Sequence, residues 1–168
     1  GGGNTFTNGG SGSLTWIDTS SVTNMSAMFS LNSGLTSVSL LDTSNVENMQ
    51  SMFRSYYSTN LTSVSLPKTG NVTNMSNMFR SSSKLTTVSL PEMGKVEDMS
   101  KMFFGASSLT SISLDDTSSV TDMSEMFSRV DMGPFGVSPV FAQDIRNFDV
   151  TSVSNFDDMF VEATGMIS

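Results

Sequence analysis

Apolar positions recur along this chain in one fixed arrangement. The arrangement reads Val-x-x-Met-x-x-Met-Phe and, after a short polar segment, continues as Leu-x-x-Val-x-Leu. Its first valine recurs at Val22, Val46, Val72, Val96, Val120 and, in an altered copy, Val153. Successive valines are 24, 26, 24, 24 and 33 residues apart, which is the range of repeats that stack as coils of a solenoid. The pattern predicts a repeat solenoid of about six coils.

The second half of each copy alternates between apolar and polar residues. In the copy at 85–90, Val88 and Leu90 are separated by one serine, and Leu85 stands three residues before Val88. Alternation with a period of two is typical of a strand that buries one face. Equivalent segments lie at 35–40, 61–66 and 109–114. Stacked in register, these segments predict a parallel β-sheet along one side of the solenoid.

The first half of each copy has a different spacing. Met75, Met78 and Phe79 stand at i, i+3 and i+4, which is typical of one apolar helix face, so we expect short helices opposite the sheet. The methionines are interpreted as core-filling side chains. An Asn or Asp precedes each such segment, at Asn24, Asn48, Asn74, Asp98, Asp122 and Asn155. These residues are predicted to cap the helices, and a column of cation ligands is the alternative.

Glycine and proline mark the limits of the repeated part. Residues 1–13 are rich in Gly and Ser and are expected to form a flexible leader, followed by one repeat solenoid over 14–168. A loop insertion is expected near 129–140, where turn-forming residues gather. Neither end shows an obvious polar cap of the kind that solenoids need. We therefore expect either part of a longer repeat array or a subunit whose ends stack on neighbours.

Composition excludes several classes of function. The chain contains no histidine and no cysteine, which removes the commonest general base, the commonest metal ligand and all thiol chemistry. We expect no enzymatic activity and no cofactor. The net charge of −8 disfavours nucleic acid and anionic membranes as partners. No apolar segment approaches the roughly 20 residues of a spanning helix, so no membrane insertion is expected.

A polar turn is predicted between each strand and the segment that follows it. These turns contain Asp18, Asp42, Lys68, Glu92 and Asp116 at equivalent places. Such residues favour turns through bonds from their side chains to the backbone. Stacked carboxylates could also attract calcium, but Lys68 interrupts the column, and we predict no metal site.

Candidate binding residues lie on the outward side of the predicted strands and in two loops. The outward strand positions form two columns, with Ser37, Ser63, Thr87 and Ser111 in the first and Ser39, Ser65, Ser89 and Ser113 in the second. Such a face is either a soluble surface or a site for a repetitive target, such as a polysaccharide, an ice lattice or another copy of the chain. The loop after Arg54 is longer and offers Tyr56 and Tyr57, and the insertion offers Phe135.

Three segments resemble known repeat families. The segments 61–67 (Leu-Thr-Ser-Val-Ser-Leu-Pro) and 85–91 (Leu-Thr-Thr-Val-Ser-Leu-Pro) resemble the BspA-like, treponemal-type leucine-rich repeats. The segment 141–160 resembles the mycoplasma-lipoprotein-type repeat, with Phe148 at that family's Trp and Phe156 at its first Met. The resemblance implies a secreted or cell-surface repeat region used for adhesion, and it supplies no catalytic residue.

The expected function is a non-enzymatic binding or adhesion module at the cell surface or outside the cell. Its partner would be an extracellular protein or a glycan. The alternative is a structural subunit that assembles end to end, through the open ends of the solenoid, into a fibre or a surface layer.

Overall fold

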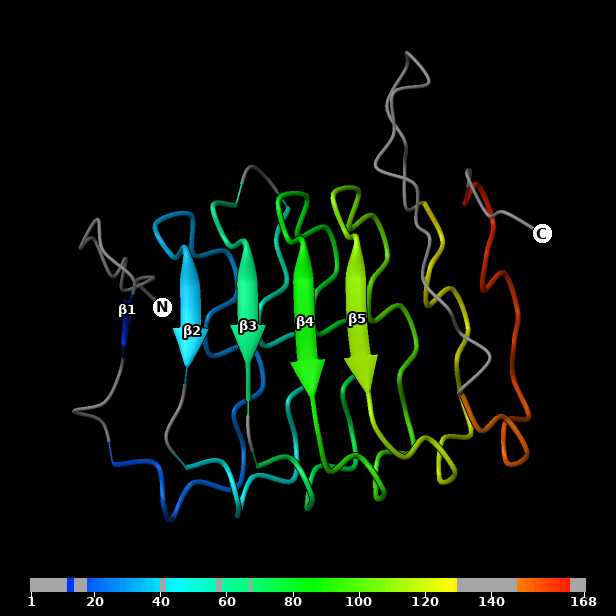
Figure 1. The fold of residues 1–168 in the computed structure, drawn as a ribbon, viewed down its shortest axis with the longest axis horizontal. Coiled ribbons are helices and arrows are strands. Elements are labelled where there is room, and N and C mark those ends of the chain that lie inside the picture. Colours follow the sequence, from blue (N-terminus) through cyan, green and yellow to red (C-terminus); the bar gives the residue numbers. More distant parts are fainter. Residues whose placement is uncertain are drawn as a thin grey trace.

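A parallel sheet forms one wall of the protein. The computed structural model describes residues 12–13, 18–39, 42–56, 59–66, 68–129 and 148–163. Its strands are β1 (Gly12–Ser13), β2 (Ser37–Ser39), β3 (Ser63–Ser65), β4 (Thr87–Leu90) and β5 (Ser111–Leu114). They lie in sequence order, and every neighbouring pair is parallel (Figure 1). The predicted parallel sheet is confirmed.

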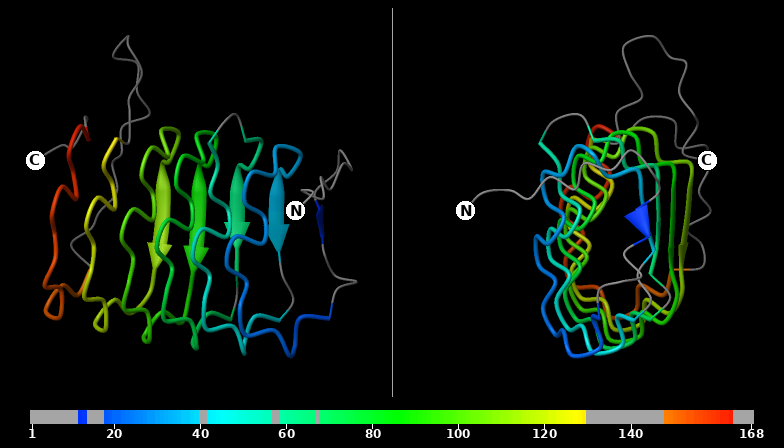
Figure 2. Two further views of the ribbon diagram at one scale, coloured as in Figure 1. Left: turned by 180° about the vertical axis from the view of Figure 1, so that it is seen from behind. Right: turned by 90° about the vertical axis from the view of Figure 1, so that its left-hand side faces the viewer.

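Each repeat lies directly on the next one. Val38 of β2 pairs with Val64 of β3, which pairs in turn with Val88 of β4. Strands that follow one another in the sequence are therefore neighbours in the sheet, and the chain returns to the same place once per repeat, as in a solenoid. Viewed along the stack, the successive turns of the chain superpose (Figure 2). The sheet begins with Gly12 and Ser13, inside the segment that we expected to be a leader.

The wall opposite the sheet is made of turns. The expected short helices are wrong, because the residues that the structure describes form no helix. In the second repeat the Met52 amide donates to the Met49 carbonyl at 3.2 Å, which closes a β-turn. The Met49 and Ser51 amides instead donate to Asn74 and Ser76 of the next repeat, both at 2.9 Å. A helix needs these amides for bonds to residues four positions earlier, so bonding between repeats replaces it.

A column of left-handed residues fixes this turn. The third residue of the turn has a φ between 51° and 57° in each repeat, at Ala27, Ser51, Asn77, Lys101, Glu125 and Asp158. A positive φ at this place is the requirement of a type II turn, and it interrupts a right-handed helix. An isolated helix of eight residues is in any case marginal. The spacing i, i+3, i+4 therefore identified the inward side chains but not the backbone that positions them.

The Asn and Asp column has the bonding expected of a cap, but it caps a turn. Asn74 Oδ1 accepts from the Ser76 amide at 2.9 Å, and Asp98 Oδ1 accepts from the Ser100 amide at the same distance. These residues also pair with one another from repeat to repeat, in the order Asn24, Asn48, Asn74, Asp98, Asp122, Asn155. Since the carboxylates and amides bond to their own turns, the column is structural.

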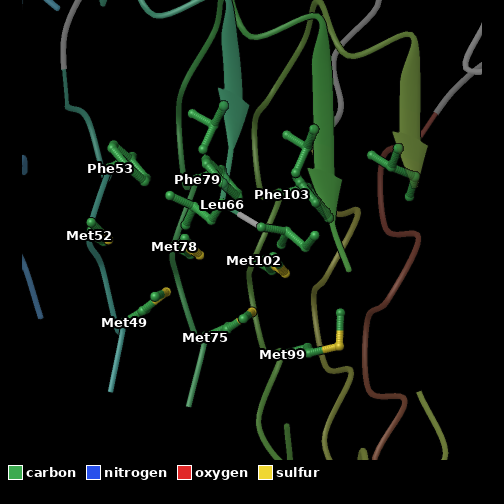
Figure 3. Close-up of a cluster of buried hydrophobic side chains, with 14 of the residues drawn as sticks. Met49, Met52, Phe53, Leu66, Met75, Met78, Phe79, Met99, Met102 and Phe103 are labelled. Carbon is green, nitrogen blue, oxygen red and sulfur yellow. The ribbon is translucent and has the colours of Figure 1, made fainter. Parts of the chain in front are cut away.

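The core consists of columns of identical side chains (Figure 3). Six phenylalanines form one stack, in the order Phe29, Phe53, Phe79, Phe103, Phe127, Phe160. Neighbouring ring centroids are 5.5–5.7 Å apart and the ring planes differ by 2–8°. The methionine columns lie below the rings, and Met75, Met78 and Met102 are fully buried. Valines and leucines of the sheet close the core from the other side.

The left-handed turn gives a testable difference between neighbouring residues. Ser51→Gly should raise the free energy of unfolding by about 0.5–1 kcal/mol, because glycine adopts a positive φ without a Cβ clash. Gln50→Gly, one residue earlier and solvent-exposed where Ser51 is half-buried, should lower it by a similar amount. Urea unfolding followed by circular dichroism measures both. Equal destabilisation by the two glycines would contradict the turn and favour a helix.

Candidate binding surface on the sheet

Two columns of hydroxyl groups run across the outer face of the sheet. The strand register places Ser37 next to Ser63, Ser63 next to Thr87, and Thr87 next to Ser111. The same register aligns the second column, which contains Ser39, Ser65, Ser89 and Ser113. Of Ser39 only the backbone is described. The arrangement follows from the alternation of side chains in a strand, since the valine or isoleucine between each pair points into the core.

These residues line a shallow groove of about 390 Å³. Seven of the eight predicted strand residues contribute to it. Val38, Val64 and Val88, which lie between these residues on β2, β3 and β4, also contribute. Thr87, Ser89 and Ser111 are exposed, whereas Ser37 and Ser63 are half-buried. The volume falls within the usual range for small-molecule sites, but small serine, threonine and valine residues line the groove instead of the large apolar and aromatic side chains that are common in such sites.

The groove offers neutral hydrogen bonding at a regular spacing. Each hydroxyl donates one hydrogen bond and accepts up to two. Neighbouring strands lie about 4.8 Å apart, and residues two positions apart on one strand are separated by about 6.6 Å. None of the described residues that line the groove is charged. Its chemistry therefore suits a ligand with repeated hydroxyl or amide groups rather than an ion.

Of the loop candidates, only Tyr56 lies among the described residues. The Tyr56 side chain is 57% exposed, and the Arg54 guanidinium carbon lies 4.2 Å from the centre of its ring. Tyr57 and Phe135 lie outside the described residues, as does the predicted insertion except for its first residue, Arg129. Tyr56 is not among the residues that line the groove.

Two further arginine contacts were missed by sequence reasoning. The Arg80 guanidinium carbon lies 4.6 Å from the centre of the Phe104 ring, and that of Arg129 lies 5.8 Å from it. An alignment of the repeats indicates the contact between Arg80 and Phe104, because each of these residues follows the core phenylalanine of its own repeat. The chain thus has a hydroxyl-bearing groove on the sheet and, outside that groove, a set of cationic and aromatic side chains.

Hydrogen bonds within the turns hold the acidic column. The Asp149 carboxylate accepts from the Thr151 hydroxyl at 2.6 Å and from the Thr151 amide at 3.0 Å, and these bonds lower its pKa. The pKa values of Asp18, Asp42 and Asp116 are lowered by equivalent bonds from a serine two residues later. Among the described residues no group of three or more acidic side chains is placed to hold a metal ion.

The lowered pKa values of the acidic turns predict that the stability of the fold decreases at low pH. Because the folded pKa of Asp149 lies below the ordinary value of about 3.9, its contribution to stability is complete above that value and is lost as the pH falls through the folded pKa. Thr151→Val should raise the pKa of Asp149 by removing the hydroxyl donor. NMR titration of the aspartate carboxyl carbons measures it, with the exposed neighbour Ser152→Ala as the control. An unchanged Asp149 titration in Thr151→Val would exclude the hydroxyl as the cause.

The described part of the chain contains no helix with the length and hydropathy required to cross a bilayer.

Fold and surface together define a class of protein: a parallel-sheet repeat protein with exposed hydroxyl columns. The chain belongs to the family described as "Mycoplasma protein of unknown function, DUF285", which matches it twice, over residues 4–90 and 85–167. The two matches follow one another along the chain, as expected for a repeat family. Searches of the curated proteins and of the solved structures find no match.

Proposed function

We propose that this chain is a non-enzymatic binding or adhesion module that acts at the cell surface or outside the cell, and that its ligand lies in the hydroxyl groove. We further propose that its repeats form six coils of a solenoid related to the BspA-like leucine-rich repeats. The observation that carries the binding proposal is the groove itself, since residues from β2, β3, β4 and β5 align there to form one continuous surface.

The groove chemistry favours binding over catalysis. Its lining consists of serine, threonine and valine. A serine hydroxyl acts as a nucleophile only when a neighbouring base activates it, and no residue of the lining can serve as that base. A surface of unactivated hydroxyls instead recognises polar groups by hydrogen bonding, partly through water. A neutral glycan, with hydroxyls along its length, is the ligand class that fits best.

Residues in the centre of the groove allow a direct test. The double variant Ser65→Gln/Ser89→Gln places two longer side chains in the groove without adding charge. We expect it to weaken binding to neutral oligosaccharides or matrix proteins at least tenfold, because the added side chains occupy the ligand's place. Glycan and matrix-protein arrays find the ligand, and calorimetry measures the affinity. Ser26→Gln, which is exposed on the turn wall, is the matched control.

Two outcomes would contradict the proposal. The first is equal binding by the double variant and the wild type, which would place the ligand elsewhere. The second is the absence of any binding partner on either array.

End-to-end assembly is the second candidate, and exposed core positions favour it. Met28 is 40% exposed, whereas the equivalent Met52 is fully buried. Phe156 is 45% exposed, whereas the equivalent Met123 is fully buried. These residues belong to the first and last copies of the turn wall among the described residues. A further repeat from a second copy of the chain would cover Met28 at one end or Phe156 at the other.

Light scattering over a wide concentration range tests the assembly. If the ends associate, the mass should rise above the 18.0 kDa of the chain as concentration increases. Phe156→Ser and Met28→Ser should each lower the association, because they remove the apolar surface that the contact buries. Tyr56→Ser is the control, since it removes a large side chain that is more exposed than Phe156 or Met28 but belongs to neither the first nor the last described turn. A constant mass of one chain at all concentrations would reject this function.

A further inference from the structure

A row of cationic and aromatic side chains lies on the edge that joins the turn wall to the sheet. Arg54, Arg80 and Phe104 occupy equivalent places in three consecutive repeats, each directly after a core phenylalanine. The Ser55 amide donates to the Arg80 carbonyl at 2.9 Å, which keeps the two arginine positions in register. Their backbones are therefore about 4.8 Å apart. The connecting segments lie at the upper edge of Figure 1, above the starts of β3, β4 and β5.

Aromatic rings orient the arginine side chains. The guanidinium of Arg54 stacks on Tyr56, and that of Arg80 stacks on Phe104, with distances of 4.2 and 4.6 Å to the ring centres. Stacking on a ring leaves the edge of the planar guanidinium, with its N–H donors, free for other partners. We call Arg54, Tyr56, Arg80 and Phe104 the arginine ridge.

The charge of the ridge is not compensated within the described part of the chain. The protein has 16 acidic and 8 basic residues, so carboxylates are in excess. The ion pairs of the described residues nevertheless involve Lys68, Lys101 and Arg129, and neither Arg54 nor Arg80. Arg80 donates to the neutral amide of Asn77 at 3.2 Å.

One nitrogen atom of the Arg54 side chain also lacks a hydrogen-bond partner. Its Nε atom is buried and has no hydrogen-bond partner. Leaving a buried donor of a charged group without a partner costs more than leaving a neutral one. Two adjacent like charges add repulsion. An anion bound at the terminal nitrogens of both side chains would offset the desolvation and remove the repulsion.

We propose that the arginine ridge binds an anionic group, a carboxylate or a sulfate, of an acidic saccharide. Arg54 and Arg80 hold the anion, and the 57% exposed ring of Tyr56 contacts the sugar. The cavity that the described residues form beside Arg54 has a volume of about 10 Å³, which is enough for one water molecule and too small for a peptide side chain. The net charge of −8 opposes a dense polyanion such as nucleic acid. This site is separate from the groove and does not rest on the function proposed for it.

The probes are a chondroitin sulfate tetrasaccharide, a hyaluronan tetrasaccharide and an uncharged chitin tetrasaccharide. Calorimetry at low ionic strength should show saturable binding of at least one acidic probe, and that binding should weaken as salt is added. NMR should show shifts of the Nε–H signals of the arginines. Arg54→Gln and Arg80→Gln should each weaken binding at least tenfold, and Arg80→Lys should recover only part of it, because lysine keeps the charge but loses the two-pronged geometry.

Two controls separate the ridge from general charge and from the groove. Lys95→Gln removes the same charge from an exposed turn residue and should leave binding unchanged. The groove variant Ser65→Gln/Ser89→Gln should also bind the acidic probe normally, so failure of one site leaves the other testable. Thermal unfolding confirms that each variant is folded, and if Arg54→Gln does not fold, Arg80→Gln and Arg80→Lys decide the question.

Three results would overturn the proposal. One is the absence of binding of both acidic probes. Another is binding that Arg80→Gln does not weaken. The third is tighter binding of an acidic or phosphorylated peptide than of either saccharide, which would assign the ridge to a protein partner.

Discussion

Hydrogen bonding between equivalent backbone positions is the constraint on which the rest of this structure depends. Both walls use it: the strands pair in register across the sheet, and on the turn wall every second amide donates to the next repeat. Each side chain therefore meets its own equivalent above and below. The stacked phenylalanines, the methionine columns and the hydroxyl columns all follow from this one register. A residue that packs well against itself is favoured at every level of the stack.

The same register brings like charges close together, and hydrogen bonds within each turn outweigh the resulting repulsion. Identical carboxylates in a column repel, and Asp42 does raise the pKa of Asp18 by this route. The stronger effect is the pair of bonds that each aspartate receives within its own turn, so the net pKa is lowered. Lys68 adds an ion pair to Asp42 at 3.7 Å, although both side chains are exposed and the contribution to stability is small. Local bonds, rather than pairing of charges, hold the acidic turns.

The two candidate surfaces differ in chemistry because they arise from different parts of the repeat. The groove lies on the sheet, where the outward residues are serine at every position except Thr87, and it is neutral and regular. The arginine ridge lies at a position that differs between repeats, since Ser30, Arg54, Arg80 and Phe104 follow the core phenylalanines in successive copies. A regular surface suits a repetitive ligand, whereas a local cluster suits one defined group. The family match adds the repeat class to this picture and leaves the assignment of ligands to the experiments above.

The sequence by itself determined the repeat, the parallel strands, the inward residues and the hydroxyl columns. Spacing alone was sufficient there, because a strand alternates its side chains and equivalent residues of stacked repeats must align. It did not determine the backbone of the turn wall. The spacing of Met75, Met78 and Phe79 states which side chains point inward, but a helix and a turn satisfy it equally. The choice depended on whether the amides bond within the repeat or to the next one, and only the stacked structure supplies that neighbour. The contacts of the arginine ridge also depend on the tertiary structure. Arg80 and Phe104 are 24 residues apart in the chain, and stacking of the repeats brings them into contact.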